Sequence, residues 1–257
     1  MMEVLAGGRE GKITRVEGKV HRPAGAWTPH VHALLRHVRT QGFTGVPEPF
    51  GFDADGNEVV SYIAGEVSNY PLSPNARSVN ALVSSAKLLR AYHEATVSFV
   101  KGLKGDEPWF LPALEPVEVM CHGDYAPYNI VLDGDHAIAI IDFDVAHPGP
   151  RVWDIAYALY RFAPLTGSSN ADGFGNIAEQ ISRCRLFCDA YGLPDEERVG
   201  LIDGVIERLQ VLVDTMQAGA AAGNEAFQAN IAEGHHRLYL GDIEYLQENG
   251  ERIQAEL

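Results

Sequence analysis

Residues 121–144 read CHGDYAPYNIVLDGDHAIAIIDFD, and this stretch decides how the chain is interpreted. Its two short apolar runs are typical of β-strands. They enclose polar side chains of the kind that move protons or bind cations, namely His122, Asp124, Asn129, Asp142 and Asp144. A plain core strand has no reason to carry these groups, and a surface loop has no reason to carry the apolar frame. Phosphoryl transfer from a metal-bound nucleotide needs both a carboxylate that receives a hydroxyl proton and oxygen ligands for Mg²⁺.

Asp124 is the candidate general base. It follows His122-Gly123 where an apolar run turns polar, which predicts a loop that leaves a strand. Such a loop can hold a carboxylate within hydrogen-bonding reach of a substrate proton. Taken alone, Asp124 could equally be a loop aspartate that caps a turn.

A β-hairpin is predicted around the turn Asp133-Gly134-Asp135. Asn129 opens one arm and Asp142 closes the other, so the two side chains are expected near each other and near Asp124. An amide oxygen and a carboxylate form the hard-oxygen set that Mg²⁺ prefers. The pattern H-x-D-x-x-x-x-N followed by D-F-x is also that of the catalytic loop and metal-binding segment of kinases.

Size and charge narrow the classes of function. The 257 residues suffice for one large domain or two small lobes that share a cleft. A formal net charge of −15 argues against nucleic acid as a main partner, because phosphate binding needs a basic surface. The same charge would attract a cationic small substrate; the alternative is that it only keeps the protein soluble. The sequence has no secretory signal and no apolar run of membrane-spanning length, so we expect a cytoplasmic protein without a membrane partner.

The pattern of elements predicts an α+β fold. Residues 1–65 are expected to form a small antiparallel sheet with one helix, and residues 66–257 a mainly helical part. Expected strands are residues 13–16, 19–22 and 57–63, and expected helices are residues 29–41, 78–98, 152–162, 177–191, 194–217 and 225–248. Cys121, Cys184 and Cys188 give no disulfide framework and are expected as buried thiols.

The chain resembles the aminoglycoside phosphotransferase family, a branch of the protein-kinase-like fold. The motifs that carry the resemblance are HGDYAPYN at 122–129, IDFD at 141–144, WDIAYAL at 153–159, YIAGE at 62–66 and LLRAYHEAT at 88–96. The resemblance implies a bilobal fold, with ATP or GTP bound between a small N-terminal lobe at 1–65 and a helical lobe at 66–257. It implies that the γ-phosphate passes to the hydroxyl of a small molecule.

The resemblance also implies roles for single residues. Asp124 would be the catalytic base or would orient the hydroxyl, while Asn129 and Asp142 would be the Mg²⁺ ligands. Asp154 and His122 would hold the catalytic loop in place rather than react. The usual glycine after Asp-Phe is replaced by Asp144, which adds an acidic group or changes the turn.

The phosphate-binding side departs from the family pattern. A full G-x-G-x-x-G loop is missing, and Gly7-Gly8 with Gly11 is the best substitute. Strand alternation puts Arg22 on one face of its strand and Lys19 and His21 on the other. We favour Arg22 as the phosphate-binding cation because its planar fork suits phosphate oxygens, although an exposed strand arginine is the alternative.

The helix at 29–41 has no acid that could orient such a cation, and it carries histidines instead. His30 or His32 could face inward, and a metal site formed with His37 is not expected.

The acceptor is not identified by the sequence. Acids on the last helices could bind a cationic acceptor, or could simply form a solvated face. They are Asp203, Glu207, Asp214, Glu225, Glu233, Asp242, Glu244 and Glu248. Two other functions remain open: a catalytically silent nucleotide-binding or interaction module of the same fold, and transfer of AMP in place of phosphate.

Overall fold

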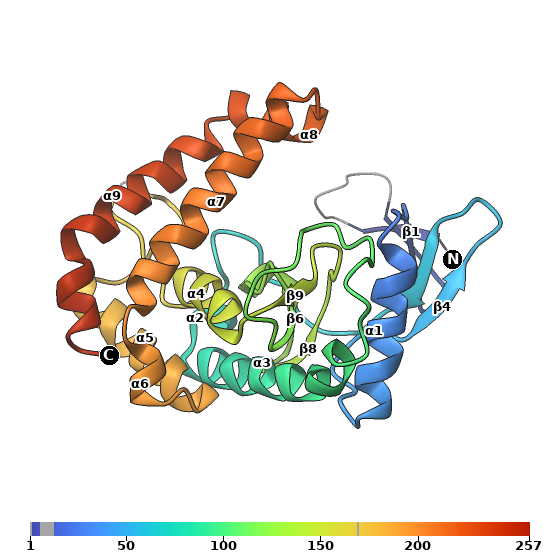
Figure 1. Cartoon of the computed structure of the whole chain (residues 1–257), viewed down its shortest axis with the longest axis horizontal. Helices are drawn as coiled ribbons and strands as arrows, with labels where there is room; N and C mark the ends of the chain where they lie inside the picture. The colour runs from blue at the N-terminus through green and yellow to red at the C-terminus, as the bar shows by residue number, and fades with distance from the viewer. Residues whose placement is uncertain (1, 6–12, 169) are drawn as a thin grey trace.

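The computed structural model describes residues 2–5, 13–168 and 170–257, and it consists of a small sheet followed by a mainly helical part (Figure 1). The sheet is antiparallel with strand order β1-β2-β3-β5-β4. Its strands are β1 (Met2–Val4), β2 (Thr14–Val16), β3 (Lys19–Arg22), β4 (Pro49–Phe52) and β5 (Glu58–Ser61). The predicted bilobal kinase-like fold is confirmed.

Local sequence explains the N-terminal sheet. Glu17 and Gly18 both have positive φ angles, 51° and 79°, as a two-residue hairpin turn between β2 and β3 requires. Helix α1 (Thr28–Thr40) begins with Pro29 in its first turn, where the missing N–H costs nothing. Its apolar face is buried through Val31, Leu34, Leu35 and Val38.

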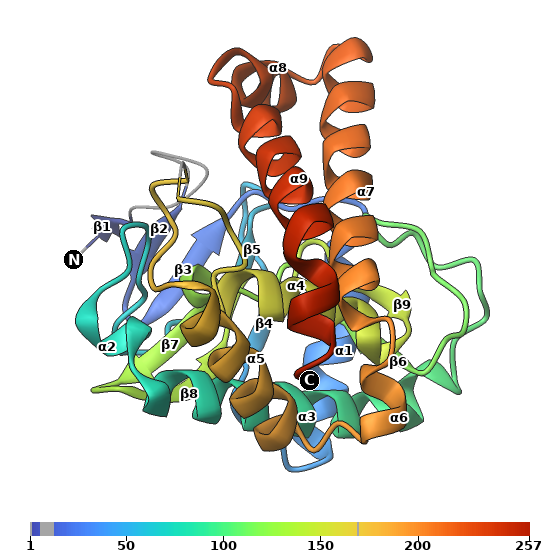
Figure 2. The same cartoon turned by 90° about the vertical axis from the view of Figure 1, so that its left-hand side faces the viewer.

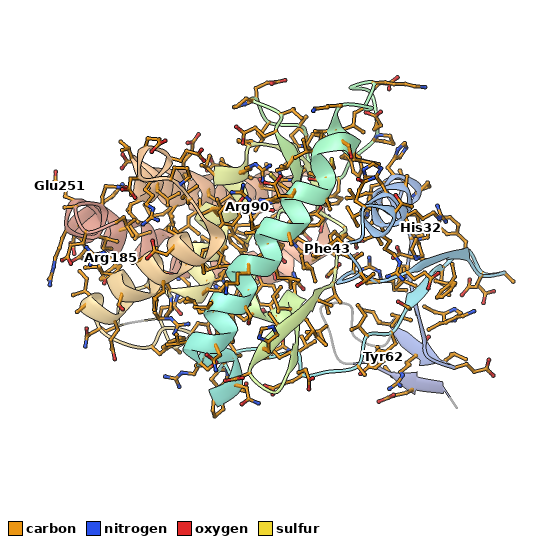
Figure 3. All side chains as sticks on the ribbon, turned by 90° about the horizontal axis from the view of Figure 1, so that it is seen from below. His32, Phe43, Tyr62, Arg90, Arg185 and Glu251 are labelled. Atoms are coloured by element: carbon orange, nitrogen blue, oxygen red, sulfur yellow. The ribbon has the colours of Figure 1, made fainter. Side chains whose placement is uncertain are left out.

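The helical part is organised around α3 (Val79–Val100), whose first turn is capped by the Ser78 hydroxyl. Figure 3 shows α3, which carries Arg90, running between the other helices on one side and α1, which carries His32, on the other. The remaining helices are α2 (Pro74–Arg77), α4 (Arg151–Phe162), α5 (Ile177–Tyr191), α6 (Asp195–Arg198), α7 (Leu201–Ala221), α8 (Glu225–Ala232) and α9 (His235–Gln254). Figure 2 shows α7 and α9 side by side, with α8 at their far end.

Two short strand pairs lie between the sheet and the helices. β6 (Val119–Cys121) pairs with β9 (His147–Gly149), and β7 (Ile130–Asp133) pairs with β8 (His136–Ile140). The single-turn helix η1 (Pro127–Asn129) leads directly into β7. Most side chains of these strands are buried, so the loops between them are held on a rigid frame.

The sequence-based boundaries differ from the structure at two helices. The helix expected at 194–217 is interrupted between α6 and α7 at Gly200, which has φ 76°. The helix expected at 225–248 is interrupted between α8 and α9 at Gly234, which has φ 83°. In both cases a glycine in the left-handed region directly precedes the second segment, and that conformation cannot be part of a continuous right-handed helix.

Strands β1, β4 and β9 were not predicted, since each has only three or four residues, and β4 and β9 also contain proline and glycine. The division into lobes at residues 1–65 and 66–257 stays a prediction. None of the described helices combines the length and apolar character needed to cross a bilayer.

Candidate active site

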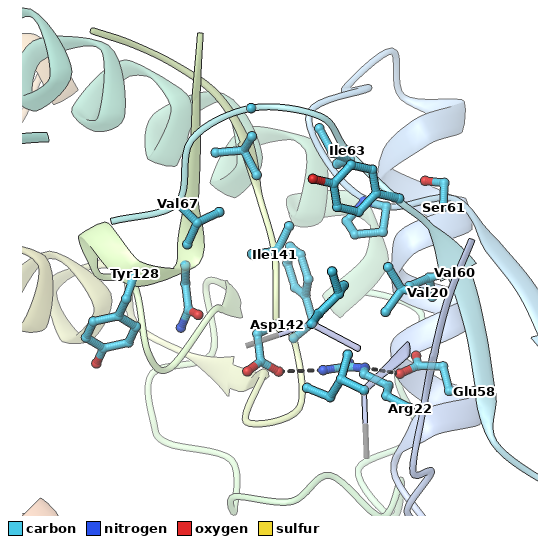
Figure 4. Close-up of a pocket in the computed structure, with 18 of the residues that line it drawn as sticks. Val20, Arg22, Glu58, Val60, Ser61, Ile63, Val67, Tyr128, Ile141 and Asp142 are labelled. Atoms are coloured by element: carbon cyan, nitrogen blue, oxygen red, sulfur yellow. Dashed lines mark hydrogen bonds and ion pairs between the residues drawn. The ribbon is translucent and has the colours of Figure 1, made fainter. Parts of the chain in front are cut away.

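A pocket of about 560 Å³ lies where the N-terminal sheet meets the helical part. Figure 4 shows its two sides, with Val20, Arg22 and Glu58 on the sheet side, opposite Tyr128, Ile141 and Asp142. The segment 61–69, which connects the sheet to the helices, forms a third wall. The predicted residues Asp124, Asn129 and Asp142 all line this pocket, so the structure brings them together.

The loop after β6 is fixed by Asp154 of α4. The Asp154 carboxylate is fully buried, and it accepts hydrogen bonds from the backbone N–H groups of His122 and Gly123, the latter at 2.8 Å. The ring of His93 lies 3.1 Å from the same carboxylate. Burial works against the charged form, but the hydrogen bonds outweigh it and hold the pKa of Asp154 below its ordinary value. The His122 ring is buried too, with Nε2 2.9 Å from the Ile141 carbonyl.

Gly123 is required by this loop. Its φ is 81°, and a Cβ at this position would lie 2.5 Å from the Val145 carbonyl oxygen. Both the left-handed backbone and the close approach exclude a side chain. The glycine thereby lets the chain turn sharply enough to present Asp124 to the pocket.

Asp124 is held on both carboxylate oxygens. Tyr128 donates its hydroxyl to Oδ1 at 2.7 Å, and Asn129 donates its amide to Oδ2 at 2.9 Å. The Tyr128 hydroxyl also lies 2.9 Å from that of Tyr157. Burial raises the pKa of Asp124 even though the Tyr128 hydrogen bond works in the opposite direction. A fixed carboxylate with a raised pKa is suited to take up a proton.

Asn129 and Asp142 offer oxygen atoms to a cation. The Asn129 amide nitrogen is taken up by Asp124, so the amide oxygen is the atom that could face a metal. Asp142 has a φ of 63°, a strained conformation for a residue with a side chain, and such strain is concentrated at functional sites. The next residue, Phe143, is buried and packs on the His122 ring with centroids 4.8 Å apart.

This oxygen pair fits Mg²⁺, which is usually held by one or two carboxylates together with substrate phosphates. The described residues contain no cluster of three His, Cys, Asp or Glu side chains that could hold a metal by themselves.

Arg22 connects the two sides of the pocket, as Figure 4 shows. Its Nη1 donates to Asp142 at 2.6 Å, its Nη2 to Asp144 at 3.0 Å, and its Nε to Glu58. Burial alone would lower the pKa of Arg22, but the three carboxylates outweigh it and raise the pKa above the ordinary value. Arg22 is therefore permanently charged, and it lies at the edge of the expected metal site.

Glu58 contacts Arg22, and His32 in turn contacts Glu58. Glu58 was not predicted, and His32 was expected only as one of two helix histidines that could face inward. Glu58 lies directly opposite Arg22 in the β3–β5 register, and its other carboxylate oxygen is 2.9 Å from Nε2 of His32 on α1. Both side chains are buried. Burial favours protonation of Glu58, but the hydrogen bonds from His32 and Arg22 prevail and lower its pKa. The missing acid of α1 is thus replaced by a carboxylate on β5 that α1 contacts through a histidine. The sequence indicated that His32 could be buried, because it lies on the same face of α1 as the apolar residue Leu35.

The other cationic candidates lie elsewhere. Lys19 packs over the Phe50 ring, and His21 lies 2.9 Å from Asp53. His37 lies 2.8 Å from Ser98, and His30 contacts the Trp109 ring. Gly7, Gly8 and Gly11, the expected phosphate loop, are outside the described residues. Of the acids on the last helices, seven are exposed (Asp203, Glu207, Asp214, Glu225, Glu233, Glu244 and Glu248) and only Asp242 is buried.

Known proteins resemble this chain in sequence and in fold. Residues 105–187 match the profile of the family described as "Phosphotransferase enzyme family". The chain is 34% identical over 208 residues to the trifolitoxin immunity protein of Rhizobium leguminosarum bv. trifolii, covering 79% of this chain and 78% of that protein.

Among solved structures, a choline/ethanolamine kinase family protein from Mesorhizobium loti superposes with a TM-score of 0.62 at 17% identity, covering 100% of this chain and 91% of that one. A spectinomycin phosphotransferase in complex with ADP and spectinomycin superposes with a TM-score of 0.59 at 14% identity, covering 96% and 88%. At these identities the structural matches speak for the fold alone.

Proposed function

The chain belongs to the phosphotransferase enzyme family, and on that premise we propose that it transfers the γ-phosphoryl group of ATP or GTP to a hydroxyl group of a small molecule. The nucleotide would lie in the pocket between the sheet and the helical part, with the acceptor beside Asp124. A cytoplasmic location would suit this reaction, because the cytoplasm supplies ATP and GTP. It would also suit the free, buried cysteines.

Asp124 would receive or orient the acceptor hydroxyl. Its two oxygens are fixed by Tyr128 and Asn129, and a base locked in one orientation loses little entropy when the hydroxyl arrives. Asn129 and Asp142 would hold Mg²⁺, which would neutralise charge on the β- and γ-phosphates. The observation that carries this proposal is the direct hydrogen bond of Asn129 to Asp124 in the pocket that Asp142 also lines.

Arg22 would take the place of the phosphate-binding lysine of kinases. Two of its N–H groups donate to Asp142 and Asp144. A bound nucleotide would exchange these carboxylates for phosphate oxygens, which frees Asp142 for the metal. Glu58 holds Nε of the same guanidinium from the sheet side, so Arg22 can change partners at one end while it stays anchored at the other.

A screen tests the proposal. Purified protein is incubated with Mg²⁺·ATP or Mg²⁺·GTP and a panel of hydroxyl compounds that includes aminoglycosides, and products are read by mass spectrometry. A gain of one phosphate group that Asp124→Ala abolishes, with nucleotide affinity largely retained, is the expected result. Near-native phosphorylation by Asp124→Ala would remove Asp124 from this role.

The same screen separates the rival functions. A gain in mass of one AMP group would indicate nucleotidyl transfer. Nucleotide binding with neither transfer nor Mg²⁺-dependent hydrolysis would indicate a catalytically silent module.

The relative that is named an immunity protein favours one biological setting for the reaction. Phosphorylation of a toxic compound would protect the cell that makes this protein. The test is to express the chain or its Asp124→Ala variant in a host that the toxic compound kills, and to compare survival. Protection that persists in the variant would separate immunity from phosphoryl transfer.

A further inference from the structure

Arg161, near the end of α4, is a buried cation beside Tyr128, the residue that donates a hydrogen bond to Asp124. Only 6% of the residue is exposed. Its guanidinium lies over the ring of Tyr70 at 4.3 Å from the centroid, and near the rings of Tyr160 and Tyr128 at 5.3 and 5.4 Å. We call these four residues the tyrosine-arginine cluster.

The cluster adjoins the proposed catalytic residue directly. Tyr128, whose ring faces Arg161, is the residue that donates its hydroxyl to Asp124 at 2.7 Å. Tyr157, one turn before Arg161 on α4, continues this hydrogen-bonded chain. A molecule that presents a hydroxyl to Asp124 and extends away from the nucleotide pocket would therefore meet the cluster.

The guanidinium of Arg161 lacks the acceptors that a buried arginine normally has. In the described part of the chain no hydrogen bond involves its side chain, and its Nε is buried without a partner. The nearest carboxylate oxygen, on the partly exposed Asp172, is 3.9 Å from Nη2. Ring faces attract a cation, but they do not accept the parallel N–H bonds that a guanidinium fork offers.

Another buried arginine shows the contrast. Arg183 donates through Nε to the Phe162 carbonyl at 2.8 Å and through Nη1 to the Arg77 carbonyl at 3.0 Å. Its role in the fold is therefore evident from its hydrogen bonds. Arg208, also close to Asp124, donates to the Gly123 carbonyl at 2.6 Å and so supports the loop. Within the described residues Arg161 has no such bond.

Apart from the long 3.9 Å ion pair with Asp172, the described groups around Arg161 do not neutralise it. Burial raises the pKa of Tyr70 to about 12 and those of Tyr128 and Tyr160 well above their ordinary value, so these phenols stay uncharged. The buried carboxylate of Asp242 is already engaged, because it accepts hydrogen bonds from Tyr160 at 2.8 Å and from Asn170 at 2.7 Å.

We propose that the acceptor is a hydroxylated carboxylic acid, whose carboxylate binds the Arg161 guanidinium within the tyrosine-arginine cluster while its hydroxyl faces Asp124. This rests on the proposed function and specifies its substrate class. A carboxylate supplies the two parallel acceptors that the guanidinium lacks, and the Tyr70 ring offers a flat face to the remainder of the molecule. A cationic acceptor would be repelled at this position.

Three compounds that differ in charge test the proposal: para-(hydroxymethyl)benzoate, its amide and para-(hydroxymethyl)benzylamine. Their binding to the full chain with Mg²⁺·ADP present is measured by calorimetry. We expect the carboxylate to bind at least about tenfold more tightly than the other two, since a bidentate charged contact exceeds the free energy of a tenfold change. In Arg161→Gln this preference should vanish, while the affinity for Mg²⁺·ADP changes less than about twofold, because Arg161 is not among the residues that line the nucleotide pocket.

Stability provides a readout that separates ligand binding from support of the fold. Arg161 has no hydrogen bond within the described residues and only a long ion pair with Asp172, so Arg161→Met should leave the midpoint of thermal unfolding unchanged or higher. Arg183→Gln, the matched buried control, should lower the midpoint and keep the preference for the carboxylate. If Arg161→Gln does not fold, Arg161→Lys replaces it, because a lysine keeps the charge and loses the fork.

Tighter binding of the amine, failure of all three compounds to bind at millimolar concentration, or a preference that survives in Arg161→Gln would overturn the proposal. These results are distinct from failure of the proposed function. A carboxylate that binds through Arg161 and receives no phosphate would contradict the transfer reaction alone. Transfer to an amine with normal Asp124 dependence would contradict the substrate class alone.

Discussion

Replacing Glu58 by glutamine tests the buried anchor of Arg22. The carboxylate receives Nε of Arg22 on one oxygen and faces Nε2 of His32 on the other at 2.9 Å. A glutamine of the same shape can accept only one of these bonds, and its NH₂ group opposes the other donor. One charge-assisted hydrogen bond is lost, and Arg22 keeps only Asp142 and Asp144 as counterions.

The expected cost in folding free energy is about 2–3 kcal/mol, the range for a hydrogen bond to a charged group. This cost is smaller than the roughly 3–5 kcal/mol that is lost when one partner of a buried ion pair is removed. The reason is that two carboxylates still contact Arg22. For a chain of this size that corresponds to a fall of roughly 4–12 °C in the unfolding midpoint. The loss should matter more with nucleotide bound, when Asp142 turns to the metal. We therefore expect the dissociation constant for Mg²⁺·ATP to rise about 10–100-fold.

Calorimetric titration with Mg²⁺·ATP and thermal unfolding measure both effects, and Asp55→Asn, on the exposed turn before β5, is the matched control. The folded-state pKa of Glu58 lies below its ordinary value of 4.5, so its stabilisation is present above that pH and is lost as pH falls through the folded-state pKa. The difference in midpoint between parent and variant should accordingly narrow as the pH falls below 4.5 and through the lowered pKa of Glu58. An unchanged affinity for Mg²⁺·ATP together with an unchanged midpoint would refute the anchoring role of Glu58.

Further predictions concern the loop and the metal. Gly123→Ala should destabilise the protein by about 2–3 kcal/mol and abolish phosphorylation, because its Cβ would meet the Val145 carbonyl at 2.5 Å; a midpoint within a degree of the parent's would contradict this. Asp154→Asn should cost about 3–5 kcal/mol, since buried donors of the loop and of His93 lose a charged acceptor, and chemical denaturation would measure it. The raised pKa of Asp124 predicts that kcat/KM falls as pH decreases through a value above the ordinary 3.8, and a profile flat down to pH 4 would argue against Asp124 as base. Chelation with EDTA should stop transfer without lowering the unfolding midpoint of the nucleotide-free protein, because no described cluster holds a structural metal.

Local patterns explain why much of the fold could be predicted. The hairpin of β7 and β8 follows from the two short apolar runs on either side of Asp133-Gly134-Asp135, and α5 from its periodicity and its Asn176 capping box. The breaks at Gly200 and Gly234 escaped prediction because a glycine inside a helical pattern is often tolerated, and only its φ angle shows whether the helix ends there.

The sequence by itself determined the Asp124, Asn129 and Asp142 constellation, since their spacing along one loop and one hairpin is a local property of the chain. Only the tertiary structure decided that Arg22 is anchored by Glu58 and His32, because strand register and helix packing bring these residues together from separate elements. It also decided that Arg161 is buried among tyrosines without a hydrogen-bonding partner in the described chain. Burial and electrostatic partnership depend on neighbours distant in sequence, and those neighbours are fixed by packing rather than by any local pattern.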